Sequence, residues 1–273
     1  MKPSRRFLWF CLALLFGFII AMGITALLAL SGMDDTAMMM LAQEITQVLV
    51  FLVPGLVVAL LAERPRAALK LGFNKSVLGA ALVSAVAFIL LLPCLDILTE
   101  WNDSWGIPHG DDTAELMLES WLMRPGWGAF AVNLLVVALT PAICEEFFFR
   151  CGLQQLMLQW LRPVWAVVLS AAIFSLAHGE FYAFVPRFIM GLVLGMLFLR
   201  TGSMWVNITC HFANNALVVV SYTLFAQGAT SANLAEGMHL HWALACLCTV
   251  ASIALFAVVC GYPKIRKSNS PTT

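Results

Sequence analysis

Long apolar stretches, separated by short polar segments, recur along most of the chain. Eight of them reach or approach the roughly 20 residues that a helix needs to cross the hydrocarbon core of a bilayer. They cover about residues 7–31, 42–62, 77–98, 127 to beyond 150, 163–179, 184–200, 205–227 and 241–262. Backbone amides find no water inside a bilayer, and barrel strands would be only about 10 residues long. The pattern therefore predicts an all-α, polytopic membrane protein, a bundle of about eight transmembrane helices.

The composition agrees with this pattern. The chain has 273 residues, of which 62% are hydrophobic and 11% are charged, whereas a soluble domain carries about 25% charged residues. We divide the chain into residues 1–124, with three helices and an outer loop, 125–227, with four helices, and 228–273, with the last helix and a tail. Within the outer loop, residues 114–123 look amphipathic, which fits an interfacial helix and a plain connecting loop equally well.

The placement of charge predicts the topology. The net charge is zero, which gives no reason to expect a nucleic-acid partner, and bilayer lipids are the expected surroundings. With the N-terminus inside, thirteen of the fifteen basic residues fall on inner segments, and the outer exceptions are Arg124 and Arg187. Cytoplasmic loops concentrate Lys and Arg, so both termini are expected in the cytoplasm. The style of the chain is bacterial, and we expect it in the inner (plasma) membrane.

Charged groups within apolar helices are expensive and call for an explanation. Glu145, Glu146 and Arg150 occur together in the run Cys144-Glu145-Glu146-Phe147-Phe148-Phe149-Arg150. Glu146 and Arg150 are four residues apart and share a helix face, so we expect an ion pair. Glu145 is rotated about 100° away, which leaves it to face an inner cavity. Pro141, just upstream, is expected to kink the helix.

Two further polar groups lie on later helices. His178 ends the predicted fifth helix, while His211 and Asn215 are four residues apart on the seventh and share a face. Taken singly, each has a plain reading as an interfacial or interhelical polar group. A carboxylate, two histidines and an amide on three helices are together typical of a hydrolytic site.

Weaker signals occur elsewhere. Gly191 and Gly195 form a GxxxG pattern, which allows close helix approach. Polar residues are also scattered through other apolar stretches, and these are Gln43, Glu44, Gln47, Asp96 and Asn133.

The late helices resemble the CPBP family, also called Abi or type II CAAX proteases, over roughly residues 125–220. The family's EExxxR, FxxxH and HxxxN motifs read here as Glu145-Glu146 with Arg150, Phe174 with His178, and His211 with Asn215. The resemblance implies that Glu145 and His178 hold and activate the attacking water, and that His211 and Asn215 complete the site. The supporting residues would be Glu146 and Arg150.

The resemblance leaves the metal open. Zinc held by Glu145, His178 and His211 is one possibility, because two histidines and a glutamate form a known catalytic ligand set. A metal-free mechanism with a glutamate-activated water is the other, and the HExxH zinc signature is missing from the sequence.

The leading hypothesis is therefore an intramembrane endopeptidase that cleaves a peptide or protein substrate near the cytoplasmic side of the membrane. A non-catalytic membrane scaffold or bacteriocin-immunity-type protein is the first alternative. A transporter or proton relay is the second, although its usual inverted repeats are not evident.

Overall fold

The computed structural model describes residues 2–107, 113–228 and 242–261, and every regular element within these ranges is a helix. The first half contains α1 (Pro3–Ala29), α2 (Asp35–Thr46), η1 (Gln47–Leu52), α3 (Val53–Leu60), α4 (Pro65–Ala68), α5 (Lys75–Asp103) and α6 (Thr113–Leu122). The second half contains α7 (Trp127–Asn133), η2 (Leu134–Leu139), α8 (Thr140–Glu146), η3 (Phe147–Gln154), α9 (Gln155–Met157), α10 (Pro163–Leu176), η4 (Phe181–Ala183), α11 (Phe184–Thr201), α12 (Met204–Ala226) and α13 (Trp242–Gly261). The elements η1, η2 and η3 are π-helical segments, and η4 is a 3₁₀ turn.

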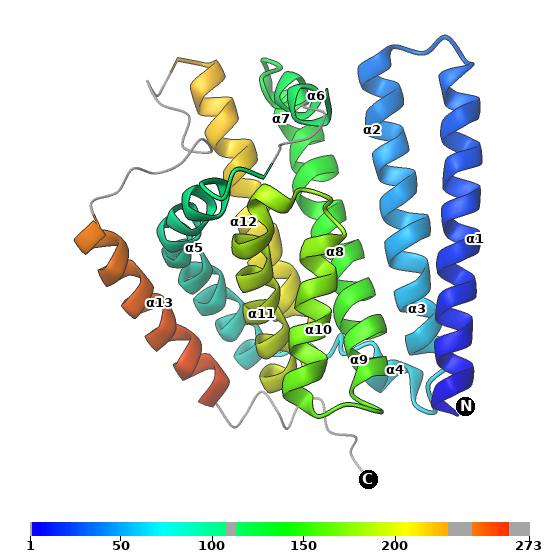
Figure 1. Ribbon diagram of the computed structural model, residues 1–273, viewed down its shortest axis with the longest axis vertical. Coiled ribbons are helices and arrows are strands. Elements are labelled where there is room, and N and C mark those ends of the chain that lie inside the picture. The colour runs from blue at the N-terminus through cyan, green and yellow to red at the C-terminus, as the bar shows by residue number, and fades with distance from the viewer. Residues whose placement is uncertain (1, 108–112, 229–241, 262–273) are drawn as a thin grey trace.

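The predicted all-α bundle is confirmed. In Figure 1, α1 and α2 lie side by side at one edge, α13 lies at the other, and α5, α10, α11 and α12 lie between them. Seven helices within the described ranges are long and apolar enough to cross a membrane, and some of them run through several elements. They are Pro3–Ala29, Asp35–Leu60, Lys75–Asp103, Trp127–Met157, Phe181–Thr201, Met204–Ala226 and Trp242–Gly261.

The eighth predicted span is shorter than expected. The apolar pattern extends over 163–179, but α10 has only 14 residues and ends at Leu176. The chain then turns through Gly179, whose φ of 75° belongs to the left-handed region that glycine adopts without strain. His178 therefore lies in a turn after the helix and not on it.

A local cap and a pair of long-range hydrogen bonds accompany two other boundaries that the apolar pattern misses. The second span begins at Asp35, seven residues before the predicted 42, because the Asp34 carboxylate accepts a hydrogen bond from the Ala37 amide at 3.1 Å. Lys75–Asp103 continues past the predicted 98, where the Asn102 side chain donates to the Phe181 carbonyl and accepts from the Val185 amide. The segment expected at 114–123 is a helix, α6, and not a plain loop.

Two prolines follow π-helical segments within the spans. Pro54 comes two residues after η1, and Pro141 comes two residues after η2. Proline removes one helical hydrogen bond and its ring crowds the carbonyl four residues earlier, which here belongs to the widened turn. The helix is thus distorted next to Glu145 and Glu146, which end α8 just before η3.

Small residues bring the helices close together. A Cβ on Gly191 would lie 3.0 Å from Ala171, and one on Gly195 would lie 3.0 Å from Val167. These contacts join α10 to α11 and confirm the close approach predicted from the GxxxG pattern. The tightest contact of this kind around the Glu145–Glu146 pair is at Gly55 of α3, where a Cβ would lie 2.4 Å from the Phe147 carbonyl oxygen.

Replacing Gly55 with alanine is expected to destabilise the bundle by about 1–3 kcal/mol, because backbone atoms of η3 cannot give way as a flexible side chain can. Thermal unfolding in detergent would measure the effect. Gly23→Ala on α1 is the control, since a Cβ there meets nothing within 4 Å. Equal melting temperatures for both variants would show that the α3–η3 contact is not tight.

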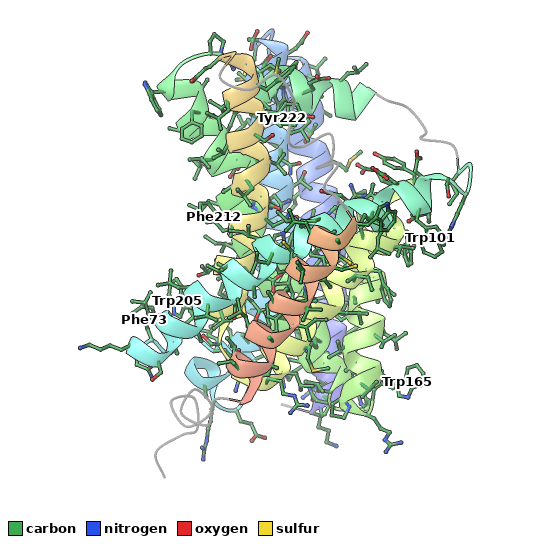
Figure 2. All side chains as sticks on the ribbon, turned by 90° about the vertical axis from the view of Figure 1, so that its left-hand side faces the viewer. Phe73, Trp101, Trp165, Trp205, Phe212 and Tyr222 are labelled. Carbon is green, nitrogen blue, oxygen red and sulfur yellow. The ribbon has the colours of Figure 1, made fainter. Side chains whose placement is uncertain are left out.

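Exposed aromatic rings are spread over the molecule, and Trp101, Trp127 and Trp242 are among them. Figure 2 shows Phe73, Trp205 and Trp165 toward one end and Tyr222 toward the opposite one. The Trp205 indole donates to the Leu71 carbonyl at 3.0 Å, and its ring packs edge-on against Phe73. Such rings are typical of a membrane–water interface. The beginning of α1 lies at the same end as Phe73, Trp205 and Trp165 (Figure 1), and the distribution of basic residues predicts that this end faces the cytoplasm.

Candidate active site

A buried ion pair connects α8 to η3. Arg150 donates through Nε to Glu146 Oε2 at 2.9 Å and through a terminal nitrogen to Oε1 at 3.4 Å, and both side chains are 0% exposed. This is the pair predicted from the spacing of four. Arg150 is among the thirteen basic residues on segments predicted to face the cytoplasm. The structure corrects this assignment, because the Arg150 side chain lies inside the helix bundle. The Arg150 guanidinium also lies 5.5 Å from the centre of the Phe174 ring.

Glu146 also binds two side chains of α12. Asn207 Nδ2 donates to its Oε2 at 3.0 Å, and His211 Nδ1 lies 3.1 Å from its Oε1. A carboxylate paired with arginine accepts hydrogen bonds, so Nδ1 of His211 carries the proton. In the neutral imidazole this leaves Nε2 as an acceptor. Glu146 thus sets both the orientation and the tautomer of His211.

Glu145 faces the other nitrogen of the same imidazole. Its Oε1 accepts a hydrogen bond from Gln47 Nε2 at 3.1 Å. Its Oε2 lies 3.9 Å from His211 Nε2 and is buried without a hydrogen-bond partner. This separation is too long for a direct hydrogen bond.

The Phe174 ring lies beside both histidines. Its centre is 4.9 Å from that of His178 and 6.0 Å from that of His211, and the ring is fully buried. His178 itself is exposed, with Nδ1 2.8 Å from the Phe174 carbonyl oxygen. Because a carbonyl only accepts, this nitrogen also carries the proton. The spacing of FxxxH thus places one aromatic ring beside both imidazoles.

A cavity of about 610 Å³ opens beside His178. Its wall is mainly apolar and comes mostly from α5, α11 and α12, and Asp96, Asn214 and Asn215 are polar members of it. Asn214 Nδ2 donates to Asn215 Oδ1 at 3.0 Å, and over the described part of the chain the Asn215 amide nitrogen makes no hydrogen bond. Neither Glu145 nor His211 is among the residues that line this cavity.

The structure therefore places the predicted residues in two adjoining groups. Glu145 and His211 share one polar network with the supporting pair Glu146–Arg150. His178 and Asn215 line the cavity next to it, and Asn215 is one helical turn from His211. Over the described ranges, no hydrogen bond joins His178 to Glu145.

The comparison with protein families supports the resemblance to type II CAAX proteases that the sequence motifs indicate. Residues 127–217 match the family model described as type II CAAX prenyl endopeptidase Rce1-like. This segment is Rce1-like. Comparison with curated proteins and with solved structures finds no match. The Rce1-like segment runs from the start of α7 into α12 and contains both polar groups of the site. With its apolar spans, the chain is a multi-pass membrane protein.

The Rce1-like site does not fit the predicted zinc ligand set in this arrangement. Zinc needs ligands that converge within about 2.0–2.3 Å of one point. Among the residues that the structure describes, no three His, Cys, Asp or Glu side chains gather closely enough to hold a metal ion. Glu145 and His211 face each other, but His178 lies in the adjoining group.

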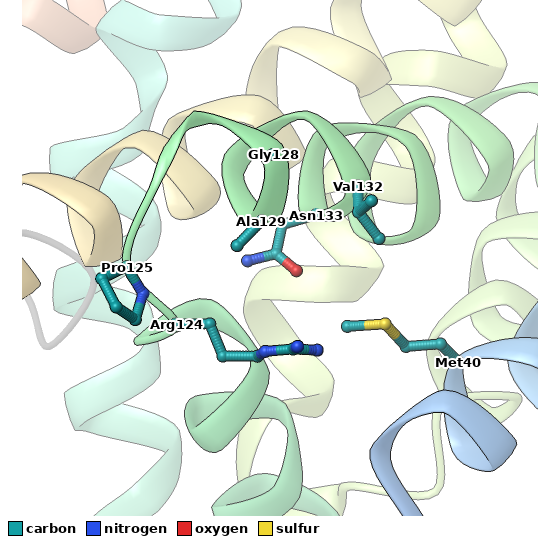
Figure 3. A pocket seen from close by; sticks show the side chains of 7 residues that line it. All are labelled: Met40, Arg124, Pro125, Gly128, Ala129, Val132 and Asn133. Atoms are coloured by element: carbon teal, nitrogen blue, oxygen red, sulfur yellow. The ribbon is translucent and has the colours of Figure 1, made fainter. Parts of the chain in front are cut away.

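A second cavity, of about 420 Å³, lies between α2 and the start of α7. Figure 3 shows Arg124, Met40 and the Asn133 amide around it. None of the predicted site residues lines it. The Rce1-like site is thus separate from this space.

Two members of the polar network have roles that sequence reasoning misses. Asn207 precedes His211 by four residues, so the spacing Asn207–His211–Asn215 was a readable signal of one polar helix face. Gln47 is noticeable as a polar residue in an apolar span, but its contact with Glu145 crosses 98 positions of sequence. It also comes from the predicted 1–124 unit and not from the Rce1-like segment.

Proposed function

We propose that this protein is an intramembrane endopeptidase in which Glu145 activates the attacking water. The observation that carries the proposal is the gap of 3.9 Å between Glu145 Oε2 and His211 Nε2. Since His211 Nδ1 donates to Glu146, both atoms across the gap are acceptors. A water there donates one hydrogen to each of them, and its oxygen lone pairs remain free to attack a carbonyl carbon.

The proton transfers follow from these contacts. As the water oxygen bonds to the carbonyl carbon, its proton passes to Glu145 Oε2, which acts as general base. Breakage of the C–N bond then requires a proton on the leaving nitrogen, and the protonated Glu145 returns it. His211 orients the water through Nε2, and the Arg150-paired Glu146 holds the imidazole in place.

The cavity beside His178 is the proposed place of the substrate chain, with the scissile carbonyl at the side where Asn215 lies one helical turn from His211. The negative charge on the carbonyl oxygen needs donors, and the free amide hydrogens of Asn215 are suited to that role. The imidazole of His178 lines the same cavity and is the second candidate. Because most basic residues fall on the segments predicted to be inner, we place the reaction near the cytoplasmic side of the membrane.

The test is proteolysis by the purified protein in liposomes. The substrates are a peptide library with prenylated and unmodified C-termini, and mass spectrometry of the products identifies the cleaved bond. Cleavage by wild type that is lost in Glu145→Gln supports the proposal. If the biological activity of the protein persists in Glu145→Gln, the chain acts as a membrane scaffold.

Cleavage is expected to continue in the presence of a chelator such as EDTA or 1,10-phenanthroline. The reason is that the proposed base needs only Gln47 and His211 beside it, and that the histidines do not converge with Glu145 on one point. Initial rates before and after prolonged chelation would be compared. A loss of activity that added Zn²⁺ restores would contradict the metal-free mechanism.

A further inference from the structure

Gln47 is an unusual residue for its position in the membrane. It lies in the long apolar helix Asp35–Leu60 and is 5% exposed. Burying an amide away from water is unfavourable unless it finds hydrogen-bond partners. Its one side-chain hydrogen bond within the described ranges goes to Glu145 Oε1, at 3.1 Å, and its own Oε1 is buried without a partner. Within the described ranges, the Gln47 amide thus makes a single hydrogen bond, and its partner is the proposed general base.

That contact decides how the carboxylate is presented. A glutamate side chain has three rotatable bonds, and its two oxygens are equivalent in solution. Gln47 holds Oε1, whereas Oε2 has no hydrogen-bond partner within the described ranges and is the atom that faces His211 Nε2. A base that is already held in its reactive orientation loses no entropy in reaching it, which is how positioning contributes to catalysis.

The backbone around Gln47 is itself held tightly. Gln47 begins the π-helical segment η1, which packs between α1 and α8. On the α1 side, a Cβ at Gly17 would lie 2.1 Å from the Leu49 carbonyl oxygen, so the two backbones are in direct contact. Further along, Gly55 presses α3 against the Phe147 carbonyl of η3. The Gly17 contact holds the backbone next to Gln47, and the Gly55 contact holds the backbone at Phe147, directly after the Glu145–Glu146 pair.

We propose that Gln47 is a positioning residue for Glu145, and that the N-terminal helices thereby complete a site whose other members lie in residues 127–217. The inference rests on the proposed function, because it assigns Gln47 a role in the same reaction. Gln47 acts through Glu145 and does not touch the substrate.

The test replaces Gln47 with methionine, which has nearly the same length and shape but no amide. Losing a hydrogen bond to a charged group is expected to lower kcat about 10- to 100-fold. KM is expected to stay within about twofold, because the cavity that would hold the peptide lies elsewhere. The matched control is Gln43→Met, the same change one helical turn earlier, at a residue whose side chain makes no hydrogen bond over the described part of the chain. It should cleave like wild type.

Two further measurements make the result decisive. Unfolding in detergent reports whether Gln47→Met is folded. If it is not, Gln47→Asn serves instead, since it keeps the amide but withdraws it by one methylene, and the same loss of kcat is expected. An unchanged kcat in a folded Gln47 variant overturns the positioning role. Glu145→Gln is measured in parallel. If Glu145→Gln cleaves like wild type, the proposed function is wrong. If Glu145→Gln is inactive while Gln47→Met cleaves like wild type, only the positioning role of Gln47 is wrong.

Discussion

Replacing Glu145 with glutamine is expected to lower kcat by about 10³-fold or more. The substitution keeps the size of the side chain and leaves an oxygen for Gln47, but an amide cannot take a proton from water. General base catalysis is worth about 10²–10⁴-fold in enzymes, and the adjacent carboxylate of Glu146 is already paired with Arg150. Single-turnover cleavage in liposomes would measure the effect.

The control for this variant is Glu63→Gln, at an exposed carboxylate on the segment that follows α3. It should cleave at the wild-type rate. Glu145→Gln must also unfold at the wild-type temperature, which would separate loss of chemistry from loss of structure. A folded Glu145→Gln protein that keeps more than a tenth of the wild-type kcat would contradict the assignment of Glu145 as the base.

Replacing Arg150 with methionine is expected to cost about 3–5 kcal/mol of folding free energy. The substitution leaves the Glu146 carboxylate fully buried without its permanent cation, and Asn207 and His211 alone cannot balance its charge. Unfolding in mixed micelles with increasing denaturing detergent would measure the loss.

The double variant Glu146→Gln with Arg150→Met separates the charge from the packing. With neither charge present, we expect most of the lost stability to return, because the buried charge is the costly element. Cleavage should not return with it, since a neutral amide in place of the Glu146 carboxylate would not fix the His211 tautomer. If the single and double variants are equally unstable, the pair contributes through the shape of Arg150 and not through its charge.

Periodicity and spacing predicted the parts of this molecule that are local. Apolar runs predicted the spans, the four-residue spacing predicted the Glu146–Arg150 pair, and Gly191 with Gly195 predicted a close helix contact. Each of these depends on residues within a few turns of one helix.

The remaining features depend on contacts that such patterns do not encode. The Gln47–Glu145 hydrogen bond links two spans, and nothing near Gln47 indicates its partner. The position of His178 depends on where α10 ends, and hydropathy does not mark that end because apolar residues continue to Ala177. Because α10 ends at Leu176, His178 lies in the group that lines the cavity and not in the network of Glu145 and His211. The FxxxH spacing therefore predicted His178 as a site residue but not which residues surround it.

The shortness of α10 also affects the lipid around it. A helix of 14 residues is about 21 Å long, whereas the hydrocarbon core is about 30 Å thick. Local thinning of the bilayer is one way in which a membrane accommodates so short a span. Thinning of this kind would bring headgroups and their hydration shell closer to the turn that carries His178. The proposed peptide hydrolysis consumes water, which the middle of a membrane does not hold, and a thinner bilayer beside α10 would supply it without a pore across the whole protein.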